Sequence, residues 1–109
     1  MDLFASTEEA SSEAPLDAVE TLIDLAERQL PAQAASGEYP VRYDHCFKRI
    51  AYDVAVGAQW DTDVTPPLYK NASPEQMRRA VEVLREMLAD PERAAAYNCR
   101  SLRYRDEQA

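Results

Sequence analysis

The chain has 109 residues and a mass of 12.3 kDa, the size of one domain. Hydrophobic residues make up 46% and charged residues 29%, which excludes disorder of the whole chain. Its two glycines and seven prolines favour helices separated by proline-marked breaks over a turn-rich β fold. No apolar run is long enough for a transmembrane helix, and the N-terminus lacks the pattern of a secretory signal. We therefore expect a cytoplasmic protein with no membrane contact.

The charge is strongly asymmetric along the chain. The net charge is −8 at pH 7, and residues 1–38 contain nine acids and one base, whereas residues 39–109 contain eleven of each. Double-stranded nucleic acid and anionic membrane surfaces both require a basic footprint. The composition therefore argues against both as partners.

Potential metal ligands of the soft type are few. The chain has two cysteines, Cys46 and Cys99, and one histidine, His45, with no CxxC motif. This set does not complete a four-ligand zinc site, and cytosolic cysteines are kept reduced. We predict no metal and no cofactor. Cys46 lies on an apolar helical stripe and is expected to be buried, whereas Cys99 is off such a stripe and is expected at the surface.

The first helix is predicted to begin at Pro15. Residues 1–14 are predicted to form a disordered acidic tail, residues 15–105 a single helical domain and residues 106–109 a frayed C-terminus. The first apolar stripe follows a helical period and is predicted to end at Pro31; it comprises Leu16, Val19, Leu22, Ile23, Ala26 and Leu30.

The second helix is predicted to begin at Pro40 and to end near Trp60. Its apolar face comprises Tyr43, Cys46, Phe47, Ile50, Val54 and Gly57. Residues 61–72 contain consecutive prolines, which disfavour helix, so this stretch is predicted to be an extended loop.

Two further helices begin at clear local signals. Ser73, Pro74 and Gln76 form the pattern of a capping box, and Asp90-Pro91 predicts a second start. The third stripe is apolar, whereas the inward face of the last helix is more polar and comprises Ala94, Tyr97, Asn98, Ser101 and Leu102. The predicted fold is a small all-α domain of four helices.

The densest group of functional side chains lies on the second helix. His45, Arg49 and Asp53 recur every four residues and therefore share one flank. These residues could form an acid–base pair with an anion clamp. Alternatively, Arg49 and Asp53 form an ion pair that braces the helix, or they reach Asn98 and Ser101 on the last helix.

Two other regions allow more than one interpretation. Trp60 could plug the core, or it could form a partner-binding surface with the loop residues Pro66, Pro67, Leu68 and Tyr69. The C-terminal arginines Arg100, Arg103 and Arg105 could contact an anion, a single-stranded RNA or the acidic tail, or could simply be solvated.

Residues 43–105 also resemble a group of small bacterial proteins. The shared frame is H-C-F-x-R-I-x-x-D, then W, then N-x-x-S-L-x-x-R, and some members are labelled as GNAT-type N-acetyltransferases. The chain itself contains no RxxGxG/A loop for an acyl-CoA pyrophosphate. The resemblance implies a polar seam between the second and fourth helices; the residues that we match to it are His45, Cys46, Arg49, Asp53, Trp60, Asn98, Ser101, Leu102 and Arg103.

These patterns lead to ranked hypotheses about function. Because no catalytic motif is present, we assign no catalytic residues and first expect a non-catalytic module that binds a protein partner or forms a homodimer. The alternative is a small enzyme or ligand-binding domain for an anionic ligand such as an acyl-CoA. Its candidate site consists of seven of the matched residues, which we call the polar seam from here on: His45, Arg49, Asp53, Trp60, Asn98, Ser101 and Arg103.

Overall fold

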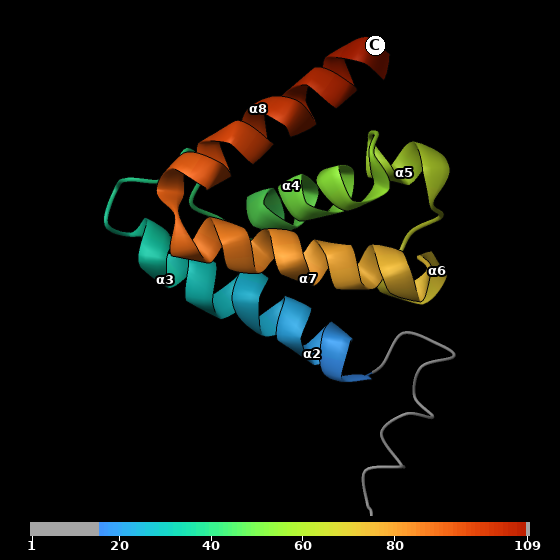
Figure 1. Ribbon diagram of the computed structural model, residues 1–109, viewed down its shortest axis with the longest axis horizontal. Coiled ribbons are helices and arrows are strands. Elements are labelled where there is room, and N and C mark those ends of the chain that lie inside the picture. The colour runs from blue at the N-terminus through green and yellow to red at the C-terminus, as the bar shows by residue number, and fades with distance from the viewer. Residues whose placement is uncertain (1–15, 109) are drawn as a thin grey trace, which may run out of the picture.

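A computed structural model describes residues 16–108, and these residues form helices joined by short loops, with no strand among them (Figure 1). The predicted helical class is confirmed, whereas the predicted count of four helices is not, because the described residues include the additional one-turn helices α5 and α6. The predicted acidic tail, residues 1–14, lies outside the described residues. In chain order the elements are α2 (Leu16–Asp24), η2 (Leu25–Gln29), α3 (Leu30–Ala34), α4 (Asp44–Val56), α5 (Trp60–Asp63), α6 (Leu68–Asn71), α7 (Pro74–Ala89) and α8 (Pro91–Gln108).

The first three elements form one continuous helix that passes through Pro31. The prediction that Pro31 ends the helix is therefore wrong. The π-helical segment η2 ends at Gln29, two residues before Pro31. The Leu30 N–H bonds to the carbonyl of Leu25, five residues earlier. Proline lacks an N–H and its ring crowds the preceding turn. The wider π turn changes the hydrogen-bond register just before the proline, which lets the helix continue to Ala34.

The second helix is shorter than predicted. It ends at Val56, because Gly57 adopts a left-handed conformation with φ +88° and its N–H bonds to the carbonyl of Asp53. A glycine in this conformation is a common helix terminator. Trp60 therefore begins the separate one-turn helix α5 instead of ending α4.

The loop predicted at residues 61–72 is only partly extended. The one-turn helices α5 and α6 occupy its two ends, and the prolines lie between them. Pro67 directly precedes α6, a position where proline is well tolerated. The Asn71 side chain donates to the carbonyls of Thr65 and Pro67, at 2.7 and 3.2 Å, and so closes the turn.

Both predicted caps of the last two helices are present. The Ser73 hydroxyl accepts from the Gln76 N–H at 3.0 Å, and the Gln76 side chain accepts from the Ser73 N–H at 2.8 Å. Asp90 accepts from the Glu92 N–H at 3.0 Å at the start of α8. Helix α8 continues to Gln108, beyond residue 105 where the helical domain was predicted to end.

Helix α7 lies at the centre of the fold, between the α2–η2–α3 helix and α4, while α8 packs against both α4 and α7 (Figure 1). Its buried side chains contact both neighbours and include Met77, Ala80, Val83, Leu84 and Met87. Three residues predicted on apolar faces are instead exposed: Ile23 (41%), Tyr43 (60%) and Leu102 (48%). No described helix is long and apolar enough to cross a membrane.

Candidate functional site

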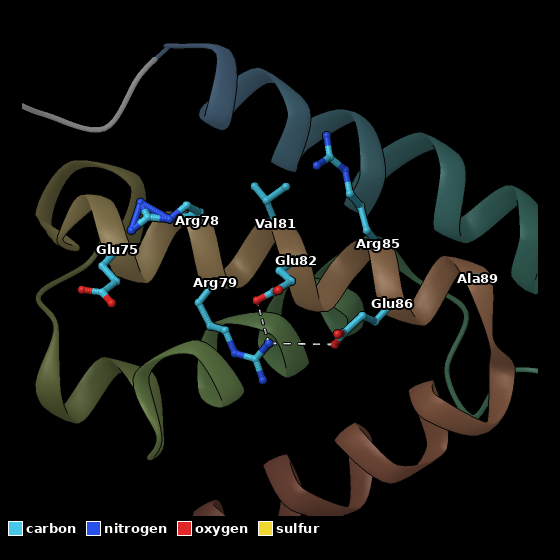
Figure 2. Close-up of a pocket in the computed structure, with 8 residues that line it drawn as sticks. All are labelled: Glu75, Arg78, Arg79, Val81, Glu82, Arg85, Glu86 and Ala89. Carbon is cyan, nitrogen blue, oxygen red and sulfur yellow. Dashed lines mark hydrogen bonds and ion pairs between the residues drawn. The ribbon is translucent and has the colours of Figure 1, made fainter. Parts of the chain in front are cut away.

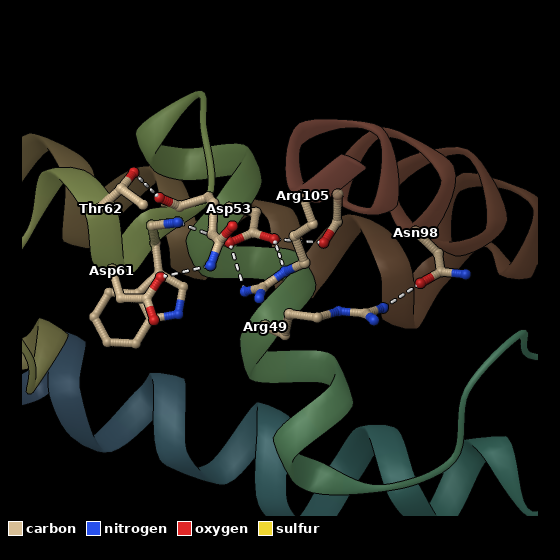
Figure 3. A network of polar contacts seen from close by, with 9 residues as sticks. Arg49, Asp53, Asp61, Thr62, Asn98 and Arg105 are labelled. Carbon is tan, nitrogen blue, oxygen red and sulfur yellow. Dashed lines mark hydrogen bonds and ion pairs between the residues drawn. The ribbon is translucent and has the colours of Figure 1, made fainter. Parts of the chain in front are cut away.

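Asp53 is the centre of a polar network between α4 and α8. Its side chain is completely buried, and Ser101 donates its hydroxyl to Oδ2 at 2.6 Å (Figure 3). Arg105 donates Nε to Oδ2 at 2.8 Å and a terminal nitrogen to Oδ1 at 3.1 Å. The backbone N–H of Trp60 donates to Oδ1 at 3.0 Å. One carboxylate therefore joins α4, α5 and α8.

The Asp53 network is closed to added ligands. A carboxylate offers about four lone-pair sites, and four hydrogen bonds reach Asp53. Burial of the charge is compensated by the two-pronged contact with Arg105, a geometry that suits a guanidinium and a carboxylate. This arrangement fastens helices together and leaves no free oxygen for proton transfer.

Arg49 lies one turn before Asp53 but does not pair with it. A terminal nitrogen of Arg49 donates to the side-chain oxygen of Asn98 on α8 (Figure 3). Its Nε is buried and has no hydrogen-bond partner among the described residues. No described carboxylate lies within ion-pair distance of Arg49, so its charge is met only by a neutral amide.

His45 and Arg103 are separate from this network. The His45 side chain is 77% exposed, lies 3.7 Å from the carboxylate of Asp44 and stacks on the ring of Tyr43. Arg103 is exposed on the outer side of α8. The structure thus brings together five of the seven residues of the polar seam, namely Arg49, Asp53, Trp60, Asn98 and Ser101.

Arg105 is the residue that sequence reasoning missed. The frame N-x-x-S-L-x-x-R, read from Asn98, ends at Arg105 and not at Arg103. Helical spacing gives the same answer, because Ser101 and Arg105 are four residues apart and share a face, whereas Arg103 points elsewhere. Both signals were present in the sequence.

Trp60 is partly buried and packs against the core. Its ring meets that of Tyr52 edge to face, with centroids 5.2 Å apart, and the nearby Leu68 is buried. This position corresponds to the predicted core plug. Burial, and secondarily the charge of Glu27, raises the pKa of Tyr52 to about 12.

The C-terminal arginines differ in their contacts. Arg100 lies over the ring of Tyr97, 5.4 Å from its centroid, while Arg105 is committed to Asp53. The Tyr97 hydroxyl donates to Glu86 on α7. Only Arg103 of the three has no described ion pair or aromatic contact.

Two shallow hollows lie on outer helix faces. One, of about 570 Å³, follows α7, where Arg79 reaches Glu82 and Glu86 while Arg85 points toward α2 (Figure 2). The other, of about 600 Å³, is on α8 and is lined by Cys99, Leu102, Arg103, Arg105 and Asp106.

The cysteines and acids form no metal site in the described part of the chain. Cys99 is exposed, as predicted, whereas Cys46 is partly exposed instead of fully buried. Residues 16–108 contain no group of three or more metal-binding side chains in reach of one another.

Comparisons with protein-family models, with curated proteins and with solved structures gave no match to this chain.

Proposed function

We propose that the chain is a non-catalytic helical module that associates with another protein, or with a second copy of itself, through the outer face of α8. The observation that carries this proposal is the position of Leu102. It is 48% exposed and lines the hollow on α8, a helix that is itself fixed to α4 through Ser101 and Arg105. A helix that is held in place presents its outer side chains to a partner at little cost in ordering.

The chemistry of this face supports a protein partner. Leu102 and Cys99 are its least polar residues, and Arg103, Arg105 and Asp106 line it with charges of both signs. Interfaces between proteins commonly combine an apolar centre with a polar rim. The burial of Asp53 supports the non-catalytic part, because a general base needs a lone pair that can reach substrate.

The outer face is tested by replacing Leu102 with glutamate. Ile23→Glu on α2 is the matched control, because it places the same charge at a similarly exposed aliphatic position on a different surface. Sedimentation velocity over a concentration series reports self-association. Quantitative affinity purification from the native lysate reports other partners, each compared between the two variants.

We expect association to be lost with Leu102→Glu and kept with Ile23→Glu. A wild-type protein that stays monomeric at all concentrations and recovers the same proteins as Leu102→Glu would contradict the proposal.

The alternative, an enzyme or acyl-CoA-binding domain that uses the polar seam, has less support. Its proposed acid–base residues are separated, since Asp53 is buried and fully hydrogen-bonded while His45 is exposed beside Tyr43. Arg49 is the one seam residue with an unused buried donor.

A further inference from the structure

We infer that Arg49 and Asn98, at the junction of α4 and α8, form a binding site for a small oxyanion, a phosphate-type or carboxylate group with at least two acceptor oxygens. This inference goes beyond the proposed module and does not depend on Leu102. The two residues face each other across the junction through the bond from the Arg49 guanidinium to the Asn98 side-chain oxygen (Figure 3).

Arg49 carries a charge that no described acid matches. Two arginines bridge α4 and α8, and Arg105 has a buried carboxylate as its partner whereas Arg49 has only the amide of Asn98. Removing a cation partly from water is costly unless an opposite charge compensates for it. Among the described residues no acid provides that charge for Arg49, so a bound anion would complete the pairing.

Arg49 also has a hydrogen-bond donor, its Nε–H, that no described residue uses. The Nε of Arg49 is buried and unbonded, and a buried donor without a partner carries the full cost of its desolvation. Nε and the adjacent terminal nitrogen form a planar fork that matches two oxygens of one anion. Arg49 as a whole is partly exposed whereas its Nε is buried, so binding of an anion at Nε requires a rotation of the side chain.

Further hydrogen-bond donors lie around the Arg49 guanidinium. The oxygen of Asn98 accepts from Arg49, and its amide nitrogen, which lies on the side away from Arg49 in Figure 3, keeps two donors. His45 lies one turn earlier on the same flank of α4 and is open to solvent, with Asp44 as its nearby acid. The donors outnumber the acceptors, which favours an anion over a cation.

The experiment follows the arginine Nε–Hε signals of the full-length protein by ¹H–¹⁵N NMR. Inorganic phosphate and acetate are titrated in separate arms, each against sodium chloride at matched ionic strength. We expect saturable shifts of the Arg49 Nε–Hε signal and of the Asn98 side-chain amide. The arm that saturates at lower concentration identifies the class of anion, and shifts that are linear and equal for all arginines would overturn the inference.

Variants test which residues hold the anion. Arg49→Lys keeps the charge but removes the planar fork, so we expect anion binding to weaken by about ten-fold or more. Arg103→Lys, on the outer face of α8, is the control and should leave anion binding unchanged. Equal loss in both variants would contradict the site. Thermal melting of each variant verifies that it is folded before titration.

A final variant places the missing charge inside the protein. Asn98→Asp supplies a carboxylate directly opposite Arg49, so we expect a higher melting temperature together with loss of the saturable phosphate and acetate shifts. If Asn98→Asp still binds the anions as wild type does, the pairing of Arg49 and Asn98 is not the site. Leu102→Glu leaves both residues in place, so failure of the module proposal and failure of this inference are distinguishable.

Discussion

Asp53 and Arg105 are 52 residues apart in the chain, yet they form a two-pronged ion pair with distances of 2.8 and 3.1 Å. The pair joins the C-terminal half of α4 to the C-terminal half of α8, a helix that α7 contacts as well. Ser101 adds a hydrogen bond to the same carboxylate. Asp53 therefore contributes to the position of α8, together with the bonds from Arg49 to Asn98 and from Tyr97 to Glu86.

Replacing Asp53 with asparagine is expected to destabilise the protein by about 3 kcal/mol, because it leaves Arg105 without its counter-charge and weakens the bond from Ser101. The free energy of unfolding in urea measures the effect. The matched control is Asp63→Asn, at an exposed acid of α5, which should change stability by less than about 0.5 kcal/mol. A double-mutant cycle with Arg105→Gln should show coupling; strictly additive effects would mean that the ion pair contributes nothing.

Gly57→Ala is expected to cost about 1 kcal/mol, since φ at this position is +88° and an L side chain is strained there. The cost is conformational only, because no atom lies within 4 Å of the added Cβ. Gly57→Asn should cost less, as asparagine tolerates the left-handed region better. Chemical denaturation of both variants provides the comparison, and equal costs would show that backbone conformation is not the cause.

The ionisation of Tyr52 is expected to lower the free energy of unfolding at high pH. Its pKa is raised to about 12 by burial and by Glu27, whereas the unfolded chain ionises this phenol near 10. The unfolded state therefore loses its proton first, and stability falls as the pH rises from about 10 toward 12.

Allowing for partial exposure, Tyr52 should account for about 1–2 kcal/mol of this alkaline loss. Tyr52→Phe should remove that part of the decline, and the exposed Tyr43→Phe should retain it. Urea unfolding across this pH range, with phenolate absorbance as the titration signal, provides the measurement. Identical pH profiles for both variants would contradict the assignment.

Tyr39→Phe is expected to cost about 1 kcal/mol, because the single O–H of the phenol is shared between the carbonyls of Met87 and Leu88, at 2.9 and 3.0 Å. These bonds tie the connection before α4 to the end of α7. Amide hydrogen exchange should accelerate in that connection and at the end of α7, but not in α2. Unchanged protection at both places would show that the two bonds do not hold the connection.

The sequence by itself determined the local features of the fold. The capping box at Ser73 and Gln76 and the cap at Asp90 were predictable because each involves residues within three positions of one another. The helical class followed from the same kind of information, namely periodic apolar stripes and the scarcity of glycine. The shared flank of Arg49 and Asp53 also followed from helical geometry.

Only the tertiary structure decided which polar groups meet and which apolar groups stay outside. Arg49 and Asp53 could have paired with each other, but the approach of α8 gave each a different partner. Leu102 belonged to a predicted inward face and is half-exposed, because α8 turns Ser101 toward α4 instead. Pro31 was a helix end by local rules, yet η2 carried the helix past it. In the first two cases contacts between residues far apart in the chain select among local arrangements, whereas at Pro31 the local rule is overridden by the π turn beside it.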